Sequence, residues 1–221
     1  MIIKEEKEVT RMKHEQGAKI MEELAKLYPD ARPELNFRNP FETLIATILS
    51  AQCTDKRVNQ CTEKLFPLYP DAHAMAQLTP EELEPHIKEC GLYRNKAKNI
   101  VAACKGLVEK YDGVVPSKRQ ELMALPGVGQ KTAGVVLMAA FGDPQIPVDT
   151  HVFRVSRRIG LADASTPEKV EVQLRELLDR DIWIFGHHLL IWHGRRICHA
   201  IKPECERCPL NNGLCGHCVE K

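Results

Sequence analysis

Apolar residues recur along this chain with the spacing of helices. One predicted helical face is formed by Phe41, Leu44, Ile45, Ile48 and Leu49. A second face follows the helix-start sequence Thr166-Pro167-Glu168 and is formed by Val170, Leu174, Leu177 and Leu178. No segment alternates apolar and polar residues as a half-buried strand does. The pattern therefore predicts an all-α fold.

Turn-forming sequences interrupt this helical pattern at intervals. They fall at residues 28–30, 69–71, 111–113 and 142–144. Because glycine and proline end helices, these breaks predict roughly ten short helices. No low-complexity linker separates the helices, so any two lobes are expected to pack directly together.

Composition narrows the class of protein. The chain has 221 residues, of which 43% are hydrophobic, and this is enough for an ordinary buried core. Its formal net charge of +1 excludes a polycation, so contact with nucleic acid would need a local patch and backbone amides. No stretch reaches the roughly 18 apolar residues that a membrane span needs. We expect a cytoplasmic protein.

Nine cysteines are distributed unevenly along the chain. Four are scattered, whereas the last 24 residues contain Cys198, Cys205, Cys208, Cys215 and Cys218. Clustering of this kind in a chain without a secretion signal indicates metal binding rather than disulfides.

The segment from Leu125 to Ala133 is the most informative in the chain. Its Gly127-Val128-Gly129 turn lies between a short helix, predicted to end near Leu125, and a second helix predicted from Thr132 to Phe141. Glycines allow close backbone approach, and the free amides at a helix start bind anions. Such a turn can also be a plain helix connector. The helical flanks favour a helix-hairpin-helix element, whose usual ligand is the DNA backbone.

Lys131 follows this turn directly and is the candidate nucleophile. An amine attacks a carbon atom only when it is unprotonated, and few lysines are unprotonated near neutral pH. The alternative is a simple phosphate contact at a helix start. A positive charge at a helix N-terminus is disfavoured by the helix dipole, which favours a chemical role for Lys131.

Asp149 stands at the start of the next predicted helix. It can be an N-cap, which contributes about 1 kcal/mol. Its carboxylate can also stabilise cationic charge on a sugar, or handle the proton released when Lys131 attacks. The two interpretations are compatible.

Five segments together resemble the endonuclease III family, the bifunctional DNA glycosylases and abasic-site lyases of the helix-hairpin-helix superfamily. The resemblance covers almost the whole chain and is carried by residues 49–55, 91–97, 125–133, 148–152 and 188–194. It implies a helical barrel lobe over residues 33–145, ending in the helix-hairpin-helix. The N-terminal helix, residues 1–32, would join the C-terminal lobe, residues 146–221. Damaged double-stranded DNA would lie in the cleft between the lobes of a monomer, associated with the nucleoid in a bacterium.

The resemblance also implies roles for single residues. Lys131 would attack C1′ of a damaged nucleoside, an oxidised pyrimidine, with Asp149 as its acidic partner. Strand cleavage would follow by β-elimination from the lysine Schiff base. Gln52 and Leu92 would fill the gap left by an extruded nucleotide, and His151 would line the pocket, while Gly127 and Gly129 anchor phosphate. Gln52 and Leu92 could instead be ordinary helix-end residues, and His151 a satisfied histidine. His187, His188 and His193 are interpreted as structural.

The spacing Cys198-x6-Cys205-x2-Cys208-x6-Cys215 resembles the four-iron four-sulfur (4Fe-4S) loop of the family. The last interval in the family is more often five residues, and the extra residue lies in the turn-forming segment 209–214. Cys218 is a possible substitute ligand. A zinc site formed by Cys205-x2-Cys208 and Cys215-x2-Cys218 is the alternative. Either metal would mainly pin the C-terminal tail.

Two other functions compete with a bifunctional glycosylase. One is a monofunctional glycosylase that uses an activated water, although the relatives of that kind lack a lysine at the position of Lys131. The other is a non-catalytic DNA-binding protein with Lys131 on a phosphate and zinc in the tail. A covalent adduct between the protein and DNA would distinguish them.

Overall fold

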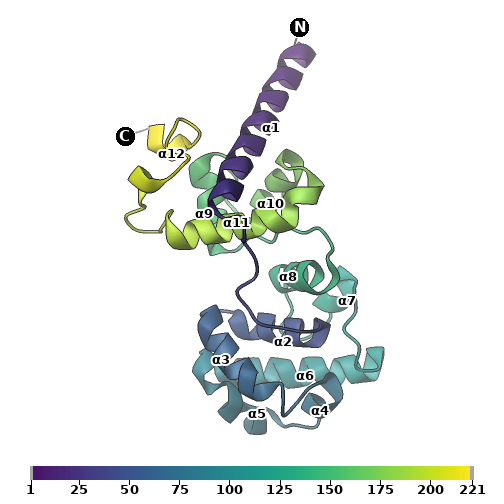
Figure 1. Ribbon diagram of the computed structural model, residues 1–221. Helices are drawn as coiled ribbons and strands as arrows, with labels where there is room; N and C mark the ends of the chain where they lie inside the picture. Colours follow the sequence, from purple (N-terminus) through teal and green to yellow (C-terminus); the bar gives the residue numbers. More distant parts are fainter. Residues whose placement is uncertain (1, 220–221) are drawn as a thin grey trace. The chain divides into compact units, whose positions relative to one another are not determined.

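The computed structural model describes the backbone of residues 2–219 and the side chains of residues 12–217. Over that range it contains twelve α-helices and three short 3-10 helices and no strand (Figure 1). The all-α prediction is confirmed. None of the helices in this described part of the chain is long and apolar enough to cross a membrane.

The chain forms two compact units, one of residues Pro33–Asp143 and one that combines Met1–Arg32 with Pro144–Lys221. The first unit, called the barrel unit here, contains α2 (Pro40–Ser50), α3 (Asp55–Leu65), α4 (Ala72–Ala76), α5 (Pro80–Ile87), η1 (Lys88–Cys90), α6 (Tyr93–Tyr111), α7 (Arg119–Met123) and α8 (Gln130–Phe141). Helix α6 packs against α2, α4 and α5, and α8 packs against α2 and α7.

Helix α2 is more deeply buried than its sequence predicts. The Asn39 side chain caps its start by accepting from the Glu42 amide at 2.9 Å, and Pro40 supplies the first helical residue. Every residue from Phe41 to Leu49 is buried, not only the one predicted face. The reason is that α3, α6 and α8 all pack against α2. Thr43 and Thr47 satisfy their buried hydroxyls by donating to backbone carbonyls one turn earlier.

The second unit, called the terminal unit here, contains α1 (Ile2–Leu27), α9 (Thr150–Ile159), α10 (Pro167–Leu177), η2 (Arg180–Ile182), α11 (Trp183–Arg196), η3 (Cys205–Arg207) and α12 (Gly216–Val219). Helix α11 packs against α9 and α1, and α12 packs against α9. The predicted start of α10 is confirmed, because the Thr166 hydroxyl accepts from the Lys169 amide at 3.4 Å. Val170 and Leu174 on this helix are fully buried.

Three histidines of α11 are part of the core of the terminal unit. His187, His188 and His193 are all buried. Burial lowers the pKa of His188 to about 3, with His187 acting in the same direction, and burial lowers the pKa of His193 to about 4. His188 and His193 are therefore neutral near pH 7 and act as packing residues.

Candidate functional site

The turn between α7 and α8 uses its two glycines differently. Gly127 has a φ of +78°, and a Cβ atom added there would lie 2.9 Å from Cβ of Asn99. Gly129 is the N-cap of α8 with a φ of −93°, and nothing lies within 4 Å of a Cβ added to it. The fold therefore requires glycine at position 127 but not at position 129.

The hairpin is fixed from both sides. Leu125 and Val128 are buried in the core of the barrel unit. On the exposed side, the Arg119 guanidinium donates to the backbone carbonyl of Gln130 at 3.2 Å and to its side-chain oxygen at 3.1 Å. These contacts hold the start of α8 against the start of α7.

Helix α8 begins at Gln130, two residues earlier than the sequence predicts, and α7 ends at Met123 rather than near Leu125. Gly129 takes an extended conformation and acts as the N-cap, so the helix starts directly after it. The Ala133 amide donates to the Gly129 carbonyl at 2.9 Å. The preceding amides of the first turn thus have no acceptor within the helix and can bind an anion. Lys131 is exposed in this turn.

Gln52 and Leu92 come close together in the barrel unit, in the segments that follow α2 and precede α6. Both have a positive φ, +52° for Gln52 and +49° for Leu92, which is uncommon for residues with a side chain. A Cβ atom added to Gly91 would lie 3.8 Å from the Gln52 carbonyl oxygen, so the two segments are adjacent. Gln52 is exposed, and the Leu92 side chain is 57% exposed. An exposed leucine in this strained conformation is unlike an ordinary helix-end residue.

Asp149 is the N-cap of α9 in the terminal unit. Its side-chain oxygen Oδ1 accepts from the Val152 amide at 2.7 Å, so the capping interpretation describes the structure. The side chain is partly exposed, which leaves its second oxygen for chemistry. Lys131 belongs to the barrel unit and Asp149 to the terminal unit, so their pairing stays a prediction.

His151 lies in the first turn of the same helix. Burial lowers the pKa of its imidazole, Arg154 and Arg195 act in the same direction, and Asp149 opposes them. Arg154 also joins α9 to the end of α11, because its guanidinium donates to the carbonyl of Gly194 at 2.9 Å and to that of Cys198 at 3.1 Å. Helix α9 is therefore tied directly to the first of the clustered cysteines.

Four of the clustered cysteines line one small cavity in the terminal unit. Its lining includes Cys198, Cys205, Cys208 and Cys215. Cys198 and Cys215 are buried, and Arg158 contacts both: its guanidinium Nη1 donates to Cys198 Sγ at 3.8 Å, and its carbonyl accepts from Cys215 Sγ at 3.7 Å. Among the described side chains, no three His, Cys, Asp or Glu residues form a ready site for a single metal ion.

The extra residue of the cysteine loop is taken up in a turn. The Cys215 amide donates to the Leu210 carbonyl at 3.0 Å, and Gly213 inside this turn has a φ of +95°. The turn brings Cys215 back to the cavity that the other three cysteines line. The side chain of Cys218 lies outside the described residues. Four soft thiols around one cavity are a donor set that fits an iron-sulfur cluster.

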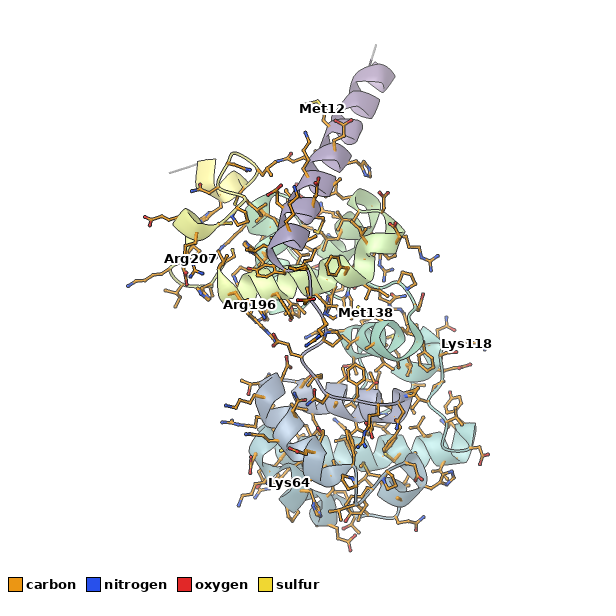
Figure 2. The ribbon with its side chains drawn as sticks, viewed as in Figure 1. Met12, Lys64, Lys118, Met138, Arg196 and Arg207 are labelled. Carbon is orange, nitrogen blue, oxygen red and sulfur yellow. The ribbon has the colours of Figure 1, made fainter. Side chains whose placement is uncertain are left out.

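Two arginines near the cysteine loop are already engaged by neighbours. The Arg196 guanidinium lies 3.7 Å from the centre of the Trp192 ring at the end of α11. Arg207 forms an ion pair with Glu204 beside the loop. Both side chains are labelled in Figure 2. Their positive charge is therefore partly offset or stacked before any other molecule binds.

Sequence reasoning missed three residues that position these groups: Arg154, Arg158 and Lys96. The two arginines are four residues apart on α9, a spacing that places them on one helical face. Lys96 shows a weaker signal, because it is a lysine among the apolar positions of α6.

Residues 45–180 match the HhH-GPD superfamily of base excision DNA repair proteins. An endonuclease III of Synechocystis sp. is 48% identical over 200 residues, which cover 90% of this chain and 91% of that protein. The endonuclease III of Escherichia coli K12 is 46% identical over 196 residues, covering 89% and 92%. A solved structure of a trapped covalent intermediate of endonuclease III and DNA has a TM-score of 0.89 and 48% identity, with 94% of this chain and 97% of that chain covered.

The chain therefore belongs to the HhH-GPD superfamily of base excision DNA repair proteins and, within it, to the endonuclease III family. Enzymes of this family are DNA glycosylases and abasic-site lyases.

The two hairpin glycines provide a test of the anion site. Gly129→Ala is expected to lower the unfolding free energy by less than about 1 kcal/mol, because the added methyl group meets open space and only the poorer capping by alanine counts against it. The substitution should weaken binding to damaged and undamaged duplexes alike, since the added methyl group stands where a phosphate would approach the amides. Gly127→Ala is the comparison and should lower stability by about 1 kcal/mol or more, because φ is positive and Asn99 is in the way. Denaturation and DNA titration of both variants measure this, and unchanged DNA affinity of Gly129→Ala would refute the anchor.

Proposed function

We propose that this chain removes oxidised pyrimidines from double-stranded DNA and cuts the strand at the resulting abasic site, with Lys131 as the nucleophile. The observation that carries the proposal is an exposed lysine in the first turn of α8, the same turn whose free amides can hold a phosphate. Family membership supports the reaction type. Duplexes with one defined lesion each, assayed for base release and strand cleavage, test the substrate class.

The chemistry follows from an amine nucleophile. The Lys131 nitrogen bonds to C1′ of the extruded nucleoside, and the bond from C1′ to the base breaks, so that the base leaves with the electron pair. Opening of the sugar ring gives a Schiff base between Lys131 and C1′. This iminium acidifies C2′, loss of a C2′ proton expels the 3′ phosphate, and the strand is cut. Water then releases the lysine.

Asp149 is proposed to act on charge and protons in this sequence. One carboxylate oxygen is held by the Val152 amide, which fixes the orientation of the group. The other can stabilise positive charge that develops on the sugar, or take the proton that the attacking amine loses. His151, in the same turn and with its pKa lowered by burial, would line the pocket as a neutral side chain.

Gln52 and Leu92 are proposed to occupy the space left by the extruded nucleotide. A base must leave the stack before C1′ can be attacked, which costs a few kcal/mol. The exposed Leu92 side chain and its neighbour Gln52 could replace the lost stacking and hydrogen bonds. Their positive φ angles indicate that the fold holds them in place at an energetic cost.

We further propose that the tail binds a 4Fe-4S cluster through Cys198, Cys205, Cys208 and Cys215. All four line one cavity, and the zinc alternative would use Cys218 in place of Cys198. A polynuclear cluster also holds its thiolates further apart than a single zinc ion does. When bound, the cluster would cross-link a tail that has little core of its own.

Two alternatives remain distinguishable by experiment. A monofunctional glycosylase would release bases but form no covalent adduct, and a DNA-binding protein would do neither. A related endonuclease III has been trapped as a covalent intermediate with DNA, which favours the bifunctional reaction for this chain. Such an enzyme would act in the compartment that contains the DNA, which is the cytoplasm in a bacterium.

Lys131→Ala is expected to abolish trapping of the protein on lesion DNA by borohydride, because no other amine lies in the first turn of α8. Affinity for the same duplex should change by less than about tenfold, since the phosphate anchor is backbone. Gel analysis of the trapped complex and a binding titration measure both. Trapping that survives the substitution would contradict the assignment.

Asp149→Asn separates capping from catalysis. Asparagine caps as well as aspartate, so the unfolding free energy should change by less than about 1 kcal/mol. The rate of base excision should fall by about a hundredfold or more, because the charge is lost. Single-turnover kinetics measure the excision rate, and denaturation measures the unfolding free energy. Near-normal turnover in this variant would mean that Asp149 acts only as the N-cap of α9.

The fourth cluster ligand is tested by a matched pair of substitutions. Cys218→Ser is expected to remain brown with full iron content, whereas Cys215→Ser should lose iron or become insoluble, because a thiolate is lost from the cluster. Iron analysis and visible absorption of the purified proteins measure this. The reverse outcome would make Cys218 the ligand.

A further inference from the structure

The barrel unit contains a buried lysine that the proposed chemistry does not use. Lys96, on α6, is 4% exposed. Lysine is almost never buried to this extent unless its ammonium has partners. Its Nζ donates to the Leu49 carbonyl at 2.8 Å and also to the Cys90 carbonyl. The partners described here are thus two backbone carbonyls from separate parts of the chain.

Both carbonyls lie at helix ends that lead into the exposed pair Gln52 and Leu92. Leu49 is in the last turn of α2, three residues before Gln52, and Cys90 ends η1, two residues before Leu92. Carbonyls at a helix C-terminus lack donors within the helix and carry partial negative charge. A single ammonium satisfies one carbonyl from each end and so ties the two segments together.

The segments that Lys96 joins are the strained ones. Gln52 and Leu92 both have a positive φ, and such conformations persist only where the surrounding structure enforces them. The Lys96 amide also donates to the Leu92 carbonyl, at 3.1 Å, which begins α6. Lys96 therefore holds Leu92 through its backbone and both flanking segments through its side chain.

The surroundings show that this contact is not an incidental surface bond. Burial lowers the pKa of Lys96, and the thiols of Cys53, Cys90 and Cys61 lie close enough to oppose that shift. Desolvating an ammonium is unfavourable, so a methionine or leucine would be easier to bury here. What an apolar side chain could not do is bind the two carbonyls.

We propose that Lys96 is a positioning residue for nucleotide extrusion: its ammonium clamps the ends of α2 and η1 together and thereby holds Gln52 and Leu92 in the arrangement that fills the emptied space in the duplex. This inference rests on the proposed function, because it assigns Lys96 a task within base extrusion and not in the attack on C1′.

The test uses Lys96→Met, which keeps the length of the side chain and removes the donors. Lys105→Met is the matched control, because Lys105 is exposed on the same helix. The rate of base excision from a duplex that carries one lesion and is otherwise fully paired should fall at least tenfold in Lys96→Met, since extrusion costs a few kcal/mol. Cleavage at a preformed abasic site in the same duplex, where no base has to be unstacked, should fall much less. Lys105→Met should leave both rates near the original.

A spectroscopic readout separates positioning from general damage. 2-Aminopurine beside the lesion should brighten when the original protein binds and should brighten less with Lys96→Met. A double-mutant cycle with Leu92→Ala should show that the two losses do not add, because Lys96 acts through Leu92. Equal loss of both activities, or losses that add fully, would overturn the proposal.

Thiol labelling of the free protein tests the clamp without DNA, and it applies even to a poorly active variant. Cys90 and Cys104 are both fully buried in the barrel unit, but only Cys90 adjoins the clamp. Lys96→Met should speed maleimide labelling of Cys90 relative to Cys104, as followed by peptide mass spectrometry. Equal protection of Cys90 before and after the substitution would refute the clamp. If the unsubstituted protein released no base, the proposed function would fail instead, whatever the labelling showed.

Discussion

Two side chains on α6, Lys96 and Asn99, join the parts of the barrel unit that carry its candidate DNA contacts. Lys96 binds the carbonyls before Gln52 and Leu92, and Asn99 lies against Gly127 in the hairpin. The two residues are three apart, so they are neighbours on one face of the helix. The first turns of α6 therefore fix the positions of Gln52 and Leu92 and of the proposed phosphate anchor at Gly127.

The packing of α2 makes this arrangement rigid. Its residues from Phe41 to Leu49 are buried because α3, α6 and α8 all pack against it. The end of α2 leads to Gln52, the start of α6 carries Leu92, and the start of α8 carries Lys131. A close-packed core resists small displacements, so the three candidate segments keep their spacing, because α6 and α8 are both packed on α2. Rigid spacing is what positioned attack on one carbon atom requires.

In the terminal unit, one helix, α9, likewise connects several candidate groups. This helix begins at Asp149, the proposed acidic partner, and its arginines at 154 and 158 bind the chain around Cys198. Anything that loosens the cysteine loop would therefore also disturb the helix whose start holds Asp149. The proposed cluster would then influence catalysis by holding the terminal unit in shape.

Local patterns predicted a large part of this structure, and tertiary contacts decided the rest. The all-α class and the Thr166 cap followed from periodicity and cap chemistry, which depend on neighbours in the sequence. The full burial of α2 did not, because it depends on α6 and α8, far along the chain, as well as on the neighbouring α3. The start of α8 was missed by two residues, since Gly129 acts as an N-cap without a side chain.

Some residues of the candidate site could likewise be predicted from local sequence, and others could not. Lys131, Gly127 and Asp149 stand at positions that local rules single out, a glycine turn and two helix starts. Gln52 and Leu92 were predicted as site residues from family resemblance alone, and their positive φ angles could not be predicted from residue type. Lys96 was missed, because a lysine among apolar helix positions is a weak signal and its partners are backbone carbonyls, which any residue type supplies.

The proposal that Lys131 is the nucleophile is tested most directly by identifying the residue that becomes bonded to DNA. The unsubstituted protein would be reduced with borohydride on a duplex that carries one lesion, digested, and mapped by mass spectrometry. The sugar remnant is expected on Lys131 alone. A remnant on another lysine or on the N-terminal amine would contradict it.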